Sequence, residues 1–190
     1  TLMTDTRTNT VPDVAPVLQV VDDAMTRTGL TQSNVHGYHT VRFSAQRSGD
    51  ALDLSSEHLT GSSADEYAVM FLDTEGYADL TGEQVTLAPG EALAWTDGAA
   101  FGDTLTLGGD TLRLRPLDSF SLVSGSSIMG LHTLYLVVPD LDSVLELRAQ
   151  QNAYANAHGG TRSMLNYTYQ FDLSGTDDEQ LDALHTLLSD

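Results

Sequence analysis

The sequence predicts an α+β fold in which a mixed sheet is flanked by helices. Short apolar runs bounded by polar residues, such as Tyr67–Leu72 and Leu134–Val138, are typical of buried strands. Residues 104–115 alternate apolar and polar side chains around a Gly-Gly pair, as a tight β-hairpin does. Apolar residues at helical spacing occur in 14–30 and 141–157.

The N-terminal part is expected to supply one helix and two strands. Residues 1–13 are rich in Thr, Asp and Asn and predict a flexible lead-in. The helix over 14–30 has Gly29 at its end, where glycine readily adopts the left-handed C-cap conformation. A strand over Val35–Phe43 follows, and after a turn a second strand is expected at Ala51–Leu54.

The central segment is expected to be scaffold, because no catalytic motif interrupts it. Thr74 is predicted to cap a short helix that a Thr-Gly pair ends. A strand over Ala92–Trp95 leads through a loop, 96–102, into the hairpin. Gly108 and Gly109 supply the positive φ angles that the two-residue hairpin turn requires.

The C-terminal part is expected to add two strands and two helices. A small, polar segment over Ser124–Gly130 predicts a mobile loop before the apolar strand that ends at Val138. After the helix over 141–157, Met164–Leu173 has a period of two with one aromatic face and predicts a strand. Thr176 caps a last helix whose first turn is acidic.

Length and composition suit one soluble domain, because the 190 residues are 41% apolar. We assign residues 14–190 to this domain. The order of elements also permits two lobes, one over 67–130 and the other over 14–66 plus 131–190. The chain begins at Thr1 and has no apolar run of about 18 residues, so we expect a piece excised from a longer protein.

The charge balance excludes several partners and chemistries. The chain has 27 acidic residues against 8 basic ones, all of them Arg, and a formal net charge of −19. Such a charge repels nucleic-acid phosphates and anionic lipid headgroups. Because the chain lacks Lys and Cys, it offers no P-loop lysine, Schiff-base lysine, thiol nucleophile or thiolate-bound zinc.

No catalytic or metal-binding residue is predicted, and no cofactor. Ser63, Ser124 and Ser127 lack the flanking glycines of a hydrolase elbow. His36 and His39 are three apart on a predicted strand, so they point to opposite faces and could not share one metal ion. We therefore expect a protein that is not an enzyme, and keep a hydrolase that uses Asp, His and Ser as a third hypothesis.

Apolar side chains in loops are the candidates for contact with a ligand or partner. Phe101, Ile128 and Met129 lie in segments where exposed apolar groups are costly unless something covers them. Trp95 is better explained by folding back onto the core. For Ile128 and Met129 both explanations stay open.

Four motifs occur in an order that resembles the extracytoplasmic domain of FtsX-like ABC transporter permeases, the group that includes MacB-type and BceB-type proteins. They are a strand and short helix ending in Leu80-Thr81-Gly82, the turn and strand 89–93, the hairpin 102–109, and the strand 135–140 that ends in Val-Pro-Asp. The likeness covers about residues 66–140.

This resemblance implies a non-catalytic domain on the extracellular face of the cell membrane. It would engage a substrate or partner, such as a peptide, an antibiotic or a lipid-linked molecule. It would work with the transmembrane helices of its parent permease and with a separate cytoplasmic ATPase subunit. The alternative is a secreted or lipid-anchored ligand-binding protein with its pocket under the loop 124–130.

Overall fold

The computed structural model describes residues 2–6, 14–30, 35–54, 63–120, 122, 131–159, 162–171 and 174–189. The helices are α1 (Ala15–Thr28), α2 (Thr74–Thr81), α3 (Asp142–His158) and α4 (Asp178–Ser189). The strands are β1 (Leu2–Thr6), β2 (Val35–Ser48), β3 (Ala51–Asp53), β4 (Glu66–Asp73), β5 (Glu91–Thr96), β6 (Thr104–Leu107), β7 (Asp110–Pro116), β8 (His132–Val138) and β9 (Met164–Phe171).

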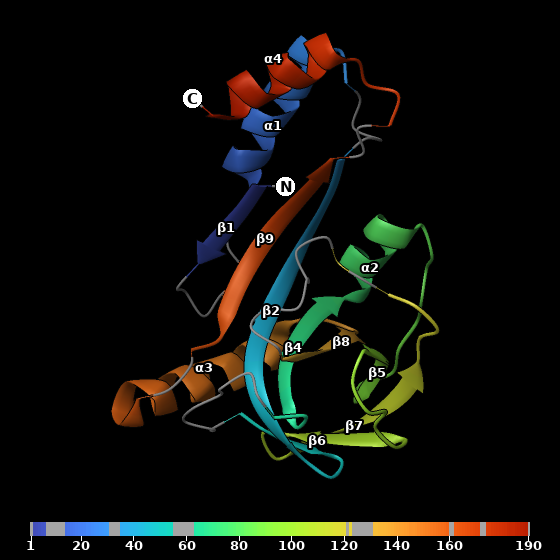
Figure 1. Ribbon diagram of the computed structural model, residues 1–190, viewed down its shortest axis with the longest axis vertical. Coiled ribbons are helices and arrows are strands. Elements are labelled where there is room, and N and C mark those ends of the chain that lie inside the picture. Colours follow the sequence, from blue (N-terminus) through green and yellow to red (C-terminus); the bar gives the residue numbers. More distant parts are fainter. Residues whose placement is uncertain are drawn as a thin grey trace.

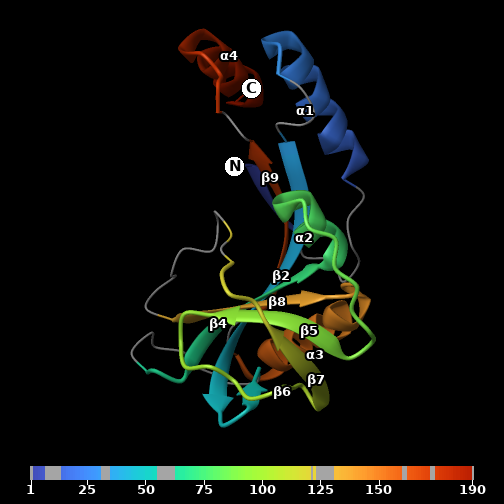
Figure 2. The ribbon, with the colours of Figure 1, turned by 90° about the vertical axis from the view of Figure 1, so that its right-hand side faces the viewer.

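Seven strands form a closed mixed barrel in the order β2-β3-β6-β7-β5-β8-β4, and the pairing of β4 with β2 closes it (Figures 1 and 2). The predicted α+β sheet with flanking helices is therefore wrong. In the closed barrel each of these strands has two neighbours, whereas an edge strand of an open sheet has only one. Strands from both of the predicted lobes take part in this one barrel.

The long strand β2 connects the barrel to the rest of the molecule. Its residues Val35–Arg42 pair with β9, and Val41–Gln46 pair with β4. The predicted strand stopped at Phe43, because polar residues such as Ser44 and Gln46 weaken the apolar pattern that follows. Pairing on both edges keeps this segment extended despite its composition.

The barrel interior is filled by alternate side chains of its strands, as the period of two predicts. Val41 and Phe43 on β2 and Val69 and Phe71 on β4 belong to one buried cluster. Helix α3 covers this cluster with Val144, Leu145 and Leu147, and its N-cap Leu141 belongs to the same cluster.

A second buried cluster lies on the outer face of β4, β5 and β8. Met70, Leu93 and Tyr135 contribute from these strands, and Tyr77 of α2 and Phe120 of the segment after β7 pack on them. Both faces of β4 and β8 are thus buried, which explains why these two strands are continuous apolar runs in the sequence. Helix α2 is held against the barrel wall by this packing.

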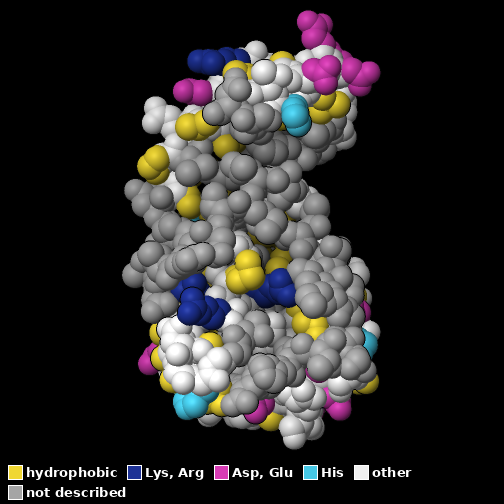
Figure 3. Space-filling view, turned by 60° about the vertical axis from the view of Figure 1, so that its left-hand side comes forward, with side chains coloured by type: hydrophobic (Ala, Val, Ile, Leu, Met, Phe, Trp, Pro, Cys, Tyr) yellow, Lys and Arg dark blue, Asp and Glu magenta, His cyan; other side chains and the backbone are white. Residues whose placement is uncertain are grey.

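The part of the molecule away from the barrel consists of β1, α1, α4 and the outer halves of β2 and β9, and we call it the stem. Helices α1 and α4 contact each other at this end of the molecule (Figure 2). Residues 2–6, expected to belong to a flexible lead-in, form β1 and pair antiparallel with β9. Acidic side chains gather at this end of the molecule (Figure 3).

Two helix caps each lie one residue away from the predicted one. Asp73, rather than Thr74, caps α2 by accepting a hydrogen bond of 2.8 Å from the backbone N–H of Gly76. The carboxylate of Asp177, rather than the hydroxyl of Thr176, accepts one of 2.8 Å from the N–H of Gln180 at the start of α4. Asp and Thr are both favoured N-cap residues, so adjacent candidates cannot be separated by propensity.

Candidate ligand-binding site

A cavity of about 940 Å³ lies where the stem meets the barrel. Its walls come from α1, β2, α2 and β9, elements that are joined only by folding. The volume falls in the range of cavities that hold small molecules or short peptide segments.

Carboxylates dominate the charge of this cavity. Asp22 comes from α1, and Asp73, Glu75 and Asp79 come from the start and middle of the α2 segment. None of the arginines in the described part of the chain lines the cavity. Four negative groups without a basic partner in the lining create a negative potential that favours a cation.

Two of these carboxylates are held by hydrogen bonds from backbone N–H groups. Asp73 caps α2, as described above, and Asp79 accepts a hydrogen bond of 2.8 Å from the N–H of Gly37 on β2. His36 Nδ1 also lies 3.8 Å from Asp79 Oδ2. Asp22 and Glu75 are exposed on their helices. The cavity therefore combines two positioned carboxylates with two that can adjust to a ligand.

Aromatic rings form the other wall of the cavity. Tyr167 on β9 pairs directly with His39 on β2, and the two rings meet edge to face with centroids 4.4 Å apart. Tyr38 also lines the cavity and is almost fully buried. Gly37 is required here, because a Cβ at this position would collide with the Tyr167 hydroxyl group. Aromatic faces beside carboxylates suit organic cations.

His39 is neutral in this setting at pH 7. Burial lowers the pKa of His39, and the negative charge of Asp73 opposes that shift only in part. Its Nε2 atom is buried and has no hydrogen-bond partner within the described residues. The imidazole therefore adds an aromatic surface to the cavity and no positive charge.

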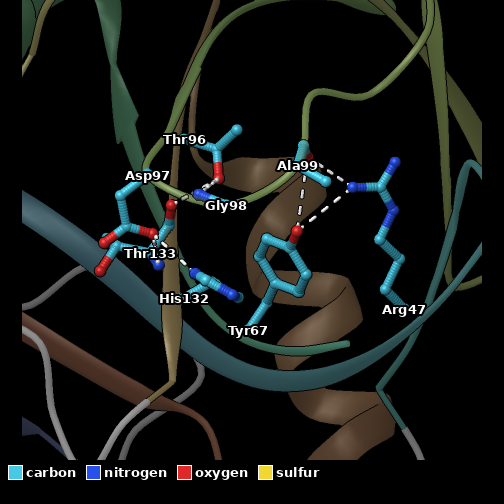
Figure 4. Close-up of polar contacts among 8 residues, drawn as sticks. All are labelled: Arg47, Tyr67, Thr96, Asp97, Gly98, Ala99, His132 and Thr133. Carbon is cyan, nitrogen blue, oxygen red and sulfur yellow. Dashed lines mark hydrogen bonds and ion pairs between the residues drawn. The ribbon is translucent and has the colours of Figure 1, made fainter. Parts of the chain in front are cut away.

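The loop 96–102, which holds the predicted contact residue Phe101, forms a separate cluster at the barrel (Figure 4). The Arg47 guanidinium lies 3.9 Å from the centroid of the Phe101 ring. Arg47 also donates hydrogen bonds to the carbonyl oxygens of Ala99 and Ala100, the latter at 2.8 Å. Phe101 packs on Tyr67 as well, with centroids 5.5 Å apart, so its ring is partly buried within the protein itself.

The other side of this loop is tied to β8. The carboxylate of Asp97 accepts a hydrogen bond of 2.7 Å from the N–H of Thr133, and His132 Nδ1 lies 3.4 Å from it. Thr96 donates from its hydroxyl group to the Thr133 carbonyl oxygen at 2.8 Å (Figure 4). These contacts attach the loop to the barrel, and the Arg47 donors are engaged by carbonyl oxygens. We read the cluster as structural.

The other residues considered in the sequence analysis are placed as follows. Ile128 and Met129 lie outside the described residues. Trp95 is half-buried and packs on the outer cluster, with its ring centroid 5.6 Å from that of Tyr135. His36 and His39 lie on one strand, and no three His, Asp or Glu side chains in the described ranges gather as metal ligands.

Sequence reasoning missed the cavity and its carboxylates. Asp22 and Asp73 are 51 positions apart, and Tyr167 follows another 94 positions later. Only the capping pattern around residues 73–76 was visible, and it indicates a helix start rather than a site. No spacing rule could bring these residues together, because the pairing of β2 with β9 and the position of α1 decide their proximity.

No family model, curated protein or solved structure matches this chain. In the parts of the chain that the structure describes, no helix has the length and apolar character needed to cross a membrane. The resemblance to FtsX-like permeases therefore stays a prediction from the motif series.

Proposed function

We propose that this chain is a non-catalytic binding module that holds an organic cation, such as a basic peptide or a cationic antibiotic, in the cavity between stem and barrel. The observation that carries the proposal is the composition of that cavity. Asp22, Asp73, Glu75 and Asp79 share about 940 Å³ with the aromatic ring of Tyr167, and no arginine of the described ranges lines this space. Carboxylates attract the charge, and the aromatic wall accommodates the carbon framework and adds cation–π attraction.

The charge of the whole chain supports the same ligand class. A formal net charge of −19 attracts cations over a distance set by ionic strength, and it repels anionic ligands. Among the cargoes that the permease resemblance suggests, basic peptides and cationic antibiotics fit this charge, whereas an anionic lipid-linked molecule does not. Charge complementarity therefore favours cationic ligands over anionic ones.

We further propose that the module is the extracytoplasmic domain of an FtsX-like permease, driven by a separate cytoplasmic ATPase. The order of its sequence motifs supports this assignment. The arrangement of the stem is compatible with it, because α1 and α4 lie side by side at the end away from the barrel (Figure 1). A ligand in the cavity would touch both α1 and the barrel, so its presence could alter how the two parts sit together.

Isothermal titration with hexa-arginine and with spermine tests the binding proposal. The variant Asp22→Asn/Glu75→Gln removes two exposed carboxylates of the cavity that the structure does not use as caps. At about 0.5 kcal/mol for each exposed pair, affinity should fall about fivefold. Raising the salt concentration should also weaken binding.

The matched control is Asp110→Asn/Glu146→Gln, which removes the same two charges from exposed positions on β7 and α3. It should bind as the wild-type chain does, apart from a small loss of long-range attraction. Equal losses of affinity in both double variants would mean that net charge alone explains the effect, and they would contradict binding in the cavity. Failure of both probes to bind would reject the proposal.

The gene that encodes this chain tests the permease assignment. We expect hydrophobic spans to be encoded on both sides of residues 1–190, and an ATPase gene beside the permease gene. A reading frame that adds only a signal peptide or a lipid-attachment site would reject the assignment, but it would leave the cavity and its binding test intact.

A further inference from the structure

His39 is the one histidine in the lining of the cavity among the described residues. It lies on β2 at the point where this strand leaves the barrel, and its neighbour Val41 already belongs to the barrel core. Its ring packs edge-on against Tyr167, and its buried Nε2 atom has no hydrogen-bond partner in the described part of the chain. A proton taken up by the imidazole would place a positive charge in the wall of the cavity, where Nε2 has no acceptor within the described residues.

The groups around His39 determine whether such a positive charge would be stabilised or repelled. The titratable groups around it are Asp22 on α1, Asp73, Glu75 and Asp79 at α2, the Tyr167 phenol on β9 and His36 on β2. Asp73, whose negative charge acts on His39, is therefore also one of the carboxylates that would hold a cationic ligand. An imidazolium ion and a ligand cation would share the same negative charges and repel each other.

We propose that protons and the cationic ligand compete for this cavity, with the His39 imidazole as the proton acceptor. The inference rests on the proposed function and adds a means of regulation to it. Ligand binding then excludes the proton from His39, and acidification releases the ligand. An extracytoplasmic module with this property would bind its ligand at neutral pH and lose it in an acidic environment.

Linkage gives the size of the effect. When one proton must leave for the ligand to bind, affinity falls about tenfold for each pH unit below the pKa of that group. Burial lowers the pKa of His39, so the loss sets in below the usual value of about 6.5.

Calorimetric titration with hexa-arginine between pH 5 and 8 tests this competition. The variant His39→Phe keeps an aromatic ring beside Tyr167 and cannot take up a proton, and His39→Gln serves as a second neutral variant. His158→Phe is the matched control, because His158 is exposed at the end of α3. Circular dichroism at pH 8 checks that each variant is folded.

We expect the affinity of the wild-type chain and of His158→Phe to fall towards pH 5 with a slope that approaches one proton. Both His39 variants should keep a slope near zero, and binding to the wild-type chain should release a proton that buffers of different ionisation enthalpy reveal. Binding at pH 8 that does not weaken with acid, or that weakens equally in the His39 variants, overturns the inference and leaves the proposed function standing. Absence of binding at pH 8 overturns both.

Discussion

The contact between Arg47 and the loop 96–102 makes a quantitative prediction about stability. Replacing Arg47 by Met keeps the aliphatic part of the side chain and removes the guanidinium. The group lies 3.9 Å from the Phe101 ring centroid, which is worth about 1 kcal/mol. It also donates to the carbonyl oxygens of Ala99 and Ala100, which contribute about 1 kcal/mol each at this exposed site. We expect Arg47→Met to lose about 3 kcal/mol of unfolding free energy.

Urea unfolding, followed by the fluorescence of Trp95, measures this loss, because the chain has a single Trp. With a slope of about 2 kcal/mol per molar urea, the midpoint should fall by about 1.5 M. The matched control is Arg113→Met, since the Arg113 side chain is 70% exposed and its Nη1 atom lies 3.6 Å from Glu91 Oε1. Exposed ion pairs contribute less than about 1 kcal/mol. If Arg47→Met and Arg113→Met unfold at the same urea concentration, the loop is not held as we describe.

Two further predictions concern Gly98 and His39. Gly98→Ala should lower the unfolding free energy by about 1–3 kcal/mol, because its Cβ would lie 2.6 Å from the Tyr67 hydroxyl oxygen and 2.9 Å from Cγ of His132. Thermal denaturation measures this loss of stability. An equal loss in Gly102→Ala would contradict the packing argument. Because the folded protein lowers the pKa of His39, the unfolded chain binds protons more readily, so the unfolding free energy should fall as pH drops below about 6.5. Urea midpoints at pH 7.5 and 5.5 test this pH dependence of stability. The difference between the two midpoints should be smaller in His39→Phe. An unchanged difference in that variant would assign the pH dependence to other groups.

Much of the secondary structure could be predicted from the sequence. The strands over β4 and β8, the hairpin of β6 and β7, and all four helices are present where the patterns placed them, within a few residues. Gly29, Gly108 and Gly109 have the expected positive φ angles of 72°, 59° and 97°. These features depend on neighbouring residues in the chain, so local propensity and spacing were sufficient to find them.

The candidate site could not be predicted in the same way. In the sequence, the carboxylates of the cavity fit helix caps or exposed helix positions. In the structure, each of them also occupies such a position. Phe101 was predicted to contact a ligand or partner because it is an apolar residue in a loop. In the structure Arg47, which lies 54 positions earlier, covers its ring. A cation–π contact between distant segments leaves no periodic pattern in the sequence, so the exposure of Phe101 could not be judged from its neighbours alone.

By itself the sequence determined the charge of the protein, the chemistries that it lacks, and where most helices and strands begin and end. Only the tertiary structure decided that seven strands close into a barrel and that β2 extends beyond it to pair with β9. Short strands such as β3 and β5 pair in parallel with partners far along the chain, and an apolar run carries no information about which neighbour it will have. The cavity lies between elements that the pairing of β2 with β9 and the packing of α1 and α2 bring together, so its acidic character could not be read from the overall charge.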